Sequence, residues 1–536
     1  MQLKTLHLVL LLFSCNGLIA QDYWTFQNDT QRINVQTVSP QTSKIRSVRL
    51  NDTLIRAKID AIDLTKKKAS DLFFFPNENG HLESFSLVSI PLFASKSALA
   101  HPSIKAYRGQ STERKNVSVR ITVTPRGLSG TMRTSSGFLF FQPANGSTSS
   151  YVFYQRKDVF SDQEESLFCT TENSFPKTES IALKNELATK SQLTGSLKTY
   201  RFAVATSGEY TQYWGDDDDT NGDDTQDALA AVANTVNRMN EIFEVDLGVR
   251  LLLVSNTAII YDNPEEDPFD DNLNSEIQGV LTTEVGESNY DIGHLFHRGS
   301  ANGNAGSIGN VCESFKKGSG FSSHPFTATN GSSGGFLTDY FDIDYVAHEV
   351  GHQFGGTHTY SHENEFSGVN SEPGSGSTIM SYAGIVSGQN LQRHSDPYFH
   401  YHNIVQINTY SAQNSCQQAE VVVNQVPTVS AGNDVTIPIG TAYVLNAVAQ
   451  DSDGDQLTYC WEQLDSGIVR AQDFGPQLIA GSINRSLPPT VNSTRTIPRL
   501  AAILSGDLTE INPFLNSGWE TVSMVGRTLR WGVTVR

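Results

Sequence analysis

The sequence predicts a multi-domain protein with a β-rich N-terminal region, an α+β central domain and a C-terminal β-sandwich. A chain of 536 residues is long enough for roughly three or four domains. Short runs in which β-branched or aromatic residues alternate with polar ones fill residues 21–195 and 428–536, and such runs are typical of strands. Between these regions a strand, a long helix and a second strand follow one another, as in α+β or α/β domains.

The composition limits the classes of partner. Charged residues make up 18% of the chain and aromatic residues 10%, which excludes a disordered protein. The net charge of −19 would repel a phosphate backbone. We therefore expect no nucleic-acid partner.

The first 20 residues have the pattern of a secretory signal peptide. A basic start is followed by an apolar run and then by small residues before Gln21. We expect cleavage after Ala20 and a secreted, extracellular mature protein. The alternative is a surface lipoprotein in which Cys15 is acylated. No later apolar run reaches the roughly 18 residues of a transmembrane helix, so we expect no transmembrane span.

The region from residue 21 to 195 is predicted to be mostly β-structure. Its last part is rich in Ser, Thr, Lys and Asn without sustained periodicity, which indicates an exposed connection and a domain boundary near Gly195. The strands with the clearest alternation are expected at residues 71–76, 117–123, 137–141 and 151–154.

The central domain is predicted to open with a strand over residues 199–205. Apolar residues three or four apart then predict a helix over residues 227–243, with Asp224 or Thr225 as its N-cap. A second strand is expected at residues 249–260.

The segment from His348 to His358 reads HEVGHQFGGTH. Histidines four residues apart, here His348 and His352, project from one face of a helix, and Glu349 between them can reach a water on the same metal ion. Gly355 can adopt positive φ, so the backbone can leave the helix there and bring His358 to the metal.

Three neutral imidazoles with one open coordination position are the ligand set of catalytic rather than structural zinc. Such an ion lowers the pKa of its bound water toward about 7 and polarises a carbonyl group. Glu349 is placed to act as general base toward this water and then to pass the proton to the leaving amine. The motif therefore predicts zinc-dependent hydrolysis of an amide bond.

This spacing resembles the signature of the metzincin metallopeptidases, which also requires a methionine-containing turn downstream. Residues 377–384 read STIMSYAG, and Met380 looks like the Met-turn residue that forms an apolar floor beneath the three imidazoles. Tyr382 matches the pattern of astacins and serralysins, in which a tyrosine approaches the zinc. Tyr382 is therefore a candidate oxyanion donor, and the alternative is an aromatic residue packed beside the cleft.

Within this clan, residues 197–416 look most like the reprolysin (adamalysin) group, especially its secreted bacterial relatives. The resemblance rests on the opening YRFAVA, on the Gly-rich stretch ending at Cys312 and on the zinc-motif segment. It implies an α+β, zincin-like fold in which an edge strand, here Gly303–Val311, binds an extended substrate antiparallel to itself; the alternative is a plain Gly-rich loop. One departure is Thr359, because reprolysins commonly have Asp directly after the third histidine.

The same resemblance implies a disulfide between Cys312 and Cys416. Some reprolysins also carry calcium, and Glu209 and Asp291 fall in places that correspond to its ligands. The alternative is that both side chains are solvated carboxylates of an acidic chain.

Because the family is made as zymogens, the resemblance implies that residues 21–195 form a propeptide. A thiolate from such a segment can occupy the open position of zinc and keep the enzyme latent. Cys169 is the candidate for this cysteine switch, and the alternative is a buried apolar cysteine.

The catalytic domain is expected to span residues 196–420, with a linker after it. Residues 428–536 resemble the immunoglobulin-like modules of bacterial surface proteins, since an Asp-rich turn precedes the run LTYCW, and the alternation that stops at the last residue suggests a truncated final strand. Asp451, Asp453 and Asp455 in this turn are either calcium ligands or members of an ordinary hairpin turn.

The sequence therefore predicts a secreted zinc-dependent metalloendopeptidase (EC 3.4.24.-) that acts on protein or peptide substrates. One alternative is a cell-surface adhesion or binding protein with an inert zinc site, and another is a hydrolase of a non-protein amide. Substrate specificity and oligomeric state are not readable from this sequence.

Overall fold

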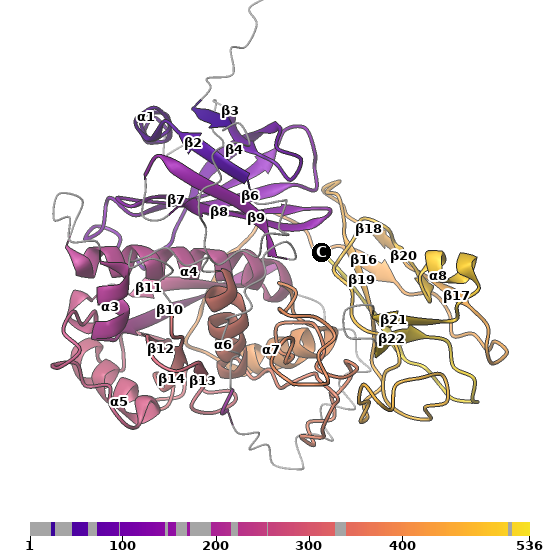
Figure 1. The fold of residues 1–536 in the computed structure, drawn as a ribbon. Coiled ribbons are helices and arrows are strands. Elements are labelled where there is room, and N and C mark those ends of the chain that lie inside the picture. Colours follow the sequence, from indigo (N-terminus) through magenta and orange to yellow (C-terminus); the bar gives the residue numbers. More distant parts are fainter. Residues whose placement is uncertain are drawn as a thin grey trace, which may run out of the picture.

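The structure is a computed structural model of the chain (Figure 1). The predicted signal peptide and Cys15 lie outside the residues it describes. These are residues 23–26, 46–62, 72–95, 97–144, 148–156, 169–171, 195–215, 223–254, 256–326, 339–512 and 517–536.

The N-terminal region is a nine-stranded antiparallel sheet that curls into a near-barrel (Figure 1, indigo to purple). Its first and last strands meet because the Tyr23 hydroxyl accepts a hydrogen bond from the Phe74 N–H and the Trp24 indole donates to the Phe74 carbonyl at 2.8 Å. The four predicted strands are confirmed. In sheet order the strands are β1 (Trp24–Phe26), β2 (Arg46–Leu50), β9 (Ser150–Gln155), β8 (Gly137–Pro143), β7 (Gly127–Thr134), β6 (Ser118–Thr124), β5 (Lys105–Ser111), β4 (Leu82–Ile90) and β3 (Leu72–Pro76), with helix α1 (Asp52–Asp60) after β2.

The central domain contains a mixed sheet in the order β11-β10-β12-β14-β13, and β15 pairs with the start of β10. The pairs among β11, β10, β12 and β14 are parallel, whereas β13 lies antiparallel on the edge. The strands are β10 (Ser196–Thr206), β11 (Val249–Val254), β12 (Ile292–His297), β13 (Asn302–Asn304), β14 (Gly320–Ser323) and β15 (Gln418–Val421).

The long helix of this domain extends beyond its predicted limits. Asp223, rather than Asp224 or Thr225, is the N-cap, because its side chain accepts from the Gln226 N–H at 2.9 Å, and the helix continues to a left-handed Gly248. The predicted strand 249–260 ends early and is followed by a 3-10 turn. The helices are α3 (Gly208–Trp214), α4 (Asp224–Leu247), η2 (Thr257–Ile259), α5 (Leu273–Val280), η3 (Leu281–Val285), η4 (Phe341–Ala347), α6 (His348–Gln353) and α7 (Tyr401–Gln413).

Buried ion pairs join the near-barrel to α4, which it covers in Figure 1. Arg120 of β6 donates to Asn237 and to Glu244, both at 2.7 Å, and Arg133 of β7 donates to Glu241 at 3.2 Å. The side chain of Arg120 is only 2% exposed. Separating the two regions would leave buried charges without partners, which is costly.

The C-terminal strands form four two-stranded sheets, so the predicted immunoglobulin-like sandwich is not seen in the described residues. The stretch between β19 and β20 contains no assigned strand: its part around Val469 packs on the central domain, whereas Asn484 and Thr490 form isolated bridges to β22 and β19. The pairs are β16 (Thr428–Ser430) with β18 (Val448–Gln450), β17 (Tyr443–Asn446) with β20 (Thr494–Ile497), β19 (Tyr459–Gln463) with β23 (Trp531–Val535), and β21 (Thr509–Asn512) with β22 (Ser517–Thr521); α8 (Leu500–Ser505) lies between β20 and β21.

That irregular stretch supports the segment that follows the zinc motif. The N–H of Val469 donates to the Ser361 carbonyl at 2.7 Å, and its carbonyl accepts from the Gly374 N–H at 2.8 Å. Arg536, near the end of the last strand, forms a buried ion pair with Asp246 of α4. The C-terminal region is therefore packed against the central domain. No helix in the described part of the chain has the length and hydropathy needed to cross a membrane.

Candidate zinc centre and catalytic cleft

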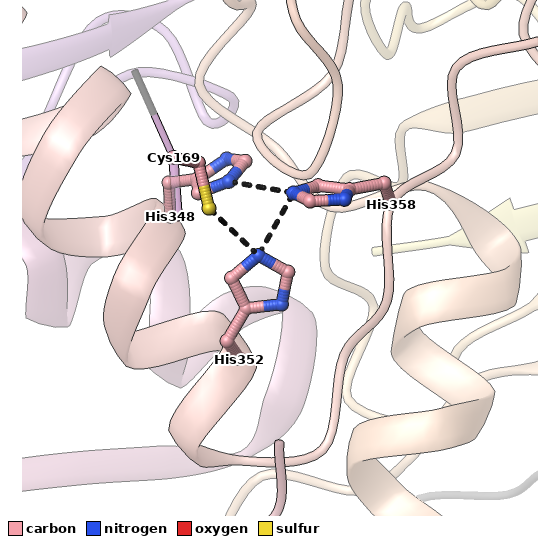
Figure 2. A group of neighbouring side chains, drawn as sticks. All are labelled: Cys169, His348, His352 and His358. Atoms are coloured by element: carbon pink, nitrogen blue, oxygen red, sulfur yellow. Dashed lines mark hydrogen bonds between the residues drawn. The ribbon is translucent and has the colours of Figure 1, made fainter. Parts of the chain in front are cut away.

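Three histidines converge at the end of helix α6. His348 and His352 lie on one face of this helix, and His358 follows after the helix has ended. Nε2 of His358 lies 3.2 Å from Nε2 of His348 and 3.0 Å from Nε2 of His352 (Figure 2). All three side chains are buried. The structure therefore brings the three predicted ligands to one point.

The outer nitrogens of the two helix histidines are held by carbonyl groups. Nδ1 of His348 lies 2.7 Å from the Ile379 carbonyl oxygen, and Nδ1 of His352 lies 2.8 Å from the Gly356 carbonyl oxygen. A carbonyl oxygen can only accept, so both Nδ1 atoms carry a proton and both Nε2 atoms present a lone pair. Burial lowers the pKa of His348 to about 3 and the pKa of His352 well below its usual range, so both rings are neutral.

Glu365 holds the third ring, a role that sequence reasoning missed. Its carboxylate oxygens lie 2.8 and 2.9 Å from Nδ1 of His358, and the Tyr360 hydroxyl donates to the same carboxylate. A carboxylate behind a metal-ligating imidazole orients the ring and increases its basicity. Glu365 lies in an irregular loop, so no periodic pattern could have identified it.

The donor set fits zinc. Ligand nitrogens at 2.0–2.1 Å in a tetrahedral site are separated by roughly 3.3 Å, close to the separations of 3.0 and 3.2 Å between these Nε2 atoms. The Nε2 lone pairs of His348 and His352 are directed at this point, where a cation would stabilise them. His348, His352 and His358 would therefore hold a catalytic zinc ion and leave its fourth position for another ligand.

Glycine is needed at two points of the zinc motif. Gly355 ends the helix with a φ of 91°, as the sequence predicted. A Cβ on Gly351 would lie 2.5 Å from Sδ of the buried Met380, so the methionine packs against α6 only because residue 351 is glycine. The Met380 carbonyl also accepts from the Thr359 N–H at 3.1 Å. Met380 thus lies where a Met-turn residue is expected.

Glu349 lies in a tight, buried environment between α6 and the edge strand. Its Oε2 accepts a hydrogen bond from the Thr171 hydroxyl at 2.9 Å, and a Cβ on Gly303 would lie 2.3 Å from its Oε1. Burial raises the pKa of Glu349 to about 8. A carboxylate with a raised pKa is the stronger base when it is ionised, which suits the predicted role.

Thr359 stands where reprolysins commonly have Asp, and here it binds the buried carboxylate of Glu372. The Thr359 hydroxyl donates to Glu372 at 2.6 Å, and Glu372 also accepts from the Ser377 N–H at 2.8 Å and from the Thr378 hydroxyl. Glu372 thus connects the segment after the third histidine to the Met-turn. Sequence reasoning missed this residue, because the contact depends on how the two segments pack.

Residues 169–171, which we call the cleft segment, lie along β13. Cys169 forms a parallel bridge with Gly303, and the Thr170 N–H donates to the Gly303 carbonyl at 2.9 Å. Sγ of Cys169 lies 3.7 Å from Nε2 of His352 and points toward the three rings (Figure 2). Burial raises the pKa of the Cys169 thiol, and Glu349 raises it further.

The edge strand is shorter than the predicted range Gly303–Val311. Only Asn302–Asn304 pairs with β14. After it, the chain turns toward the end of α6, where the Gly309 N–H donates to the His352 carbonyl at 2.9 Å. This contact holds the loop near the zinc motif instead of extending the sheet.

Tyr382 lies beside the histidines. Its ring centroid is 4.5 Å from the centroid of the His358 ring, and its hydroxyl donates to the Cys169 carbonyl at 3.5 Å. The hydroxyl can therefore reach a carbonyl group of a chain in the cleft, which is what an oxyanion donor requires.

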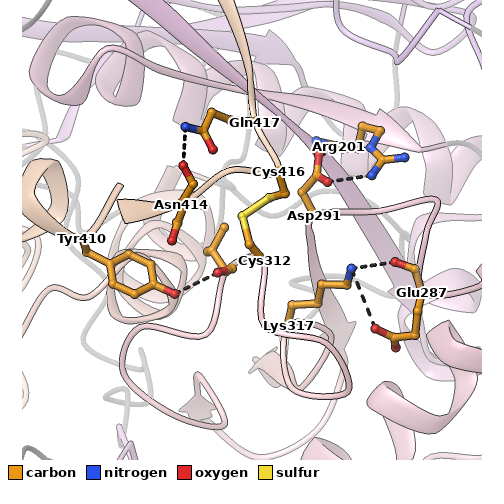
Figure 3. Close-up of a disulfide and its surroundings, with 10 residues drawn as sticks. Arg201, Glu287, Asp291, Cys312, Lys317, Tyr410, Asn414, Cys416 and Gln417 are labelled. Atoms are coloured by element: carbon orange, nitrogen blue, oxygen red, sulfur yellow. Dashed lines mark hydrogen bonds and ion pairs between the residues drawn. A yellow bond between two sulfur atoms is a disulfide. The ribbon is translucent and has the colours of Figure 1, made fainter. Parts of the chain in front are cut away.

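The disulfide between Cys312 and Cys416 is present in the structure (Figure 3). It joins the loop after β13 to the residues that follow α7, with a Cα–Cα distance of 5.8 Å. The Tyr410 hydroxyl donates to the Val311 carbonyl at 2.8 Å in the same place.

The predicted calcium ligands are not brought together in a metal-binding group within the described residues. The Asp291 carboxylate accepts from both the side chain and the backbone N–H of Arg201, each at 2.7 Å (Figure 3), whereas Glu209 lies in the first turn of α3. Asp451, Asp453 and Asp455 do form an acidic group, but Asp451 accepts from the backbone N–H groups of the other two, as in a turn.

Comparison with known proteins gives a family for the central domain. Residues 196–411 match the profile of the family described as Metallo-peptidase family M12B Reprolysin-like. A comparison with curated proteins found no match. The crystal structure of metalloproteinase-II from Bacteroides fragilis matches at 9% identity over 66% of this chain and 94% of that chain, with a TM-score of 0.36. The chain therefore contains a reprolysin-like metallopeptidase domain of family M12B, a group of zinc endopeptidases.

Proposed function

We propose that the chain is a secreted zinc-dependent metalloendopeptidase that hydrolyses peptide bonds in proteins. The proposal depends above all on the convergence of three imidazole Nε2 atoms beside the buried carboxylate of Glu349, in a domain that matches a metallopeptidase family. A zinc ion held by these nitrogens would supply a water of lowered pKa and polarise the scissile carbonyl.

The residues of the chain would then perform three tasks. Glu349 accepts the proton of the attacking water and passes it to the leaving amine. The Tyr382 hydroxyl donates to the oxygen on which negative charge develops, much as it now donates to the Cys169 carbonyl. Once the cleft segment has left, the edge of strand β13 accepts an extended substrate, which the family resemblance orients antiparallel to the strand.

The N-terminal region acts, in this proposal, as a propeptide. The Cys169 thiol lies where it can become the fourth zinc ligand, and Thr171 occupies one oxygen of Glu349. The cleft segment runs parallel to β13, opposite to the direction expected for a substrate. The segment therefore fills the cleft in an orientation that does not favour its own cleavage.

Replacement of Glu349 tests the proposal directly. We expect Glu349→Gln to lower kcat/KM for a peptide mixture by about 10³-fold while one zinc ion per chain remains bound. Glu313→Gln, a control at an exposed position outside the site, should leave both quantities unchanged. A chelator should abolish cleavage and zinc should restore it. Wild-type turnover in Glu349→Gln would reject the assigned base, and a zinc-free, inactive wild type would reject the peptidase.

A further inference from the structure

A cavity of about 320 Å³ opens beside the cleft segment. It lies between the strands β13 and β14, the end of β12 and the loop that precedes α5. Asp270 and Asp271 are the charged residues of its wall, and the described lining includes no lysine or arginine. The complete lining is Thr170, Asp270, Asp271, Asn272, Leu273, Asn274, His297, Ser300, Asn302, Phe321 and Ser323.

Strand alternation places this cavity next to the catalytic centre. A Cβ on Gly303 would point at Glu349, whereas its neighbour Asn302 lines the cavity. Along the cleft segment, Cys169 faces the histidines and Thr170, the next residue, lines the cavity. Any extended chain bound at this edge will therefore direct alternate side chains toward the zinc site and into the cavity.

We propose that this cavity is a substrate subsite that selects a lysine or arginine side chain close to the scissile bond. The inference rests on the proposed peptidase function and adds a substrate class to it. Asp270 and Asp271 would pair with the cationic group, while Leu273 and Phe321 would contact its methylene carbons.

The surroundings of the cavity favour a cation. The carboxylate of Glu276 accepts from the backbone N–H groups of Asp270 and Asp271, at 3.1 and 3.2 Å, and so holds the acidic loop at the cavity. Burial lowers the pKa of His297, so this ring adds no positive charge at neutral pH. The acidic residues Glu209 and Asp267 interact electrostatically with this ring.

The test compares peptides that differ at one position. The zinc-loaded chain, activated by limited tryptic cleavage between residues 172 and 194, is given fluorogenic peptides that carry Lys, norleucine or Glu at each of the six positions around the cleavage site. We expect Lys to raise kcat/KM at least tenfold over norleucine at one position and Glu to lower it. The double variant Asp270→Asn/Asp271→Asn should reduce the Lys preference below threefold.

A matched control removes equal charge from the same loop. Asp262→Asn/Glu265→Gln changes two exposed carboxylates that do not line the cavity, and it should keep the Lys preference. Cleavage without a Lys preference at any position, or a preference that the Asp270/Asp271 variant retains, would overturn this inference and leave the peptidase standing. Absence of cleavage for every peptide, norleucine peptides included, would instead overturn the peptidase and this inference with it.

Discussion

The Thr171 hydroxyl donates a hydrogen bond to Oε2 of Glu349 at 2.9 Å and accepts one from the Ala305 N–H at 2.8 Å. A residue of the N-terminal region thus caps the carboxylate that we assign as general base. Two residues earlier, Cys169 lies against the three histidines of the candidate zinc site. The same short segment therefore covers both the metal side and the base side of the catalytic centre.

Removing the contacts that Thr171 makes with Glu349 and Cys169 makes with the histidines should partly activate the unprocessed chain. We expect Thr171→Val to raise the peptidase rate of the full-length, zinc-loaded protein about tenfold, since a hydrogen bond to a charged group is worth about 1.5–3 kcal/mol. Cys169→Ser/Thr171→Val should raise it further. The measurement is the initial rate on a fluorogenic peptide before any processing. A double variant no more active than wild type would contradict the inhibitory role of Cys169 and Thr171.

Glu365 should control zinc affinity through His358. Glu365→Gln removes the charge behind the ring, and we expect zinc to bind roughly tenfold more weakly, within the range known for such outer partners. Competition with a chromogenic chelator measures this directly. Glu363→Gln, at a side chain that is 63% exposed, should bind zinc like wild type. Equal affinities for Glu365→Gln and wild type would show that Glu365 does not support the metal site.

The C-terminal region should matter for catalysis because Val469 supports the loop after His358. Val469→Pro removes the N–H that donates to Ser361, and we expect a lower kcat and faster zinc loss to a chelator. Val469→Ala keeps this N–H and serves as the control. It should lose stability because Val469 is fully buried, but it should retain its zinc affinity. Identical zinc loss in the two variants would refute the positioning role.

Acid should weaken the contact between the near-barrel and α4. Burial alone would raise the pKa of Glu244, but Arg120 and Arg250 outweigh it and lower the pKa from 4.5 to about 2. A folded-state pKa below the unfolded value stabilises the protein above about pH 4.5, and this contribution is lost as the pH falls toward 2. It amounts to about 3 kcal/mol at pH 7 and less than half of that at pH 3.

Urea unfolding of Glu244→Gln checks this expectation. The loss in free energy of unfolding relative to wild type should be larger at pH 7 than at pH 3. Glu266→Gln, at an exposed position, should show no such pH dependence. A loss of the same size at both pH values would mean that the ionised carboxylate is not what stabilises this interface.

Local sequence patterns were sufficient to predict the features that depend on residues close together in the chain. The helical spacing of His348 and His352, with Glu349 between them, determines their common face in any helix, and the conformational freedom of glycine at Gly355 allows the turn toward His358. Alternating apolar residues likewise predicted strands of the near-barrel. The predicted ends of helices and strands were less accurate, because caps such as Asp223 depend on the geometry of a few backbone N–H groups.

The sequence by itself determined which histidines converge in the candidate zinc site and which carboxylate we propose as general base, because these assignments depend on residue types at fixed short spacing. Only the tertiary structure decided that Glu365 and Glu372 support the site, that Thr171 caps Glu349 and that the segment around Val469 packs on the central domain. These contacts join segments whose separation along the chain carries no periodic signal. Their partners are chosen by packing and by the need of each buried polar group for a hydrogen bond.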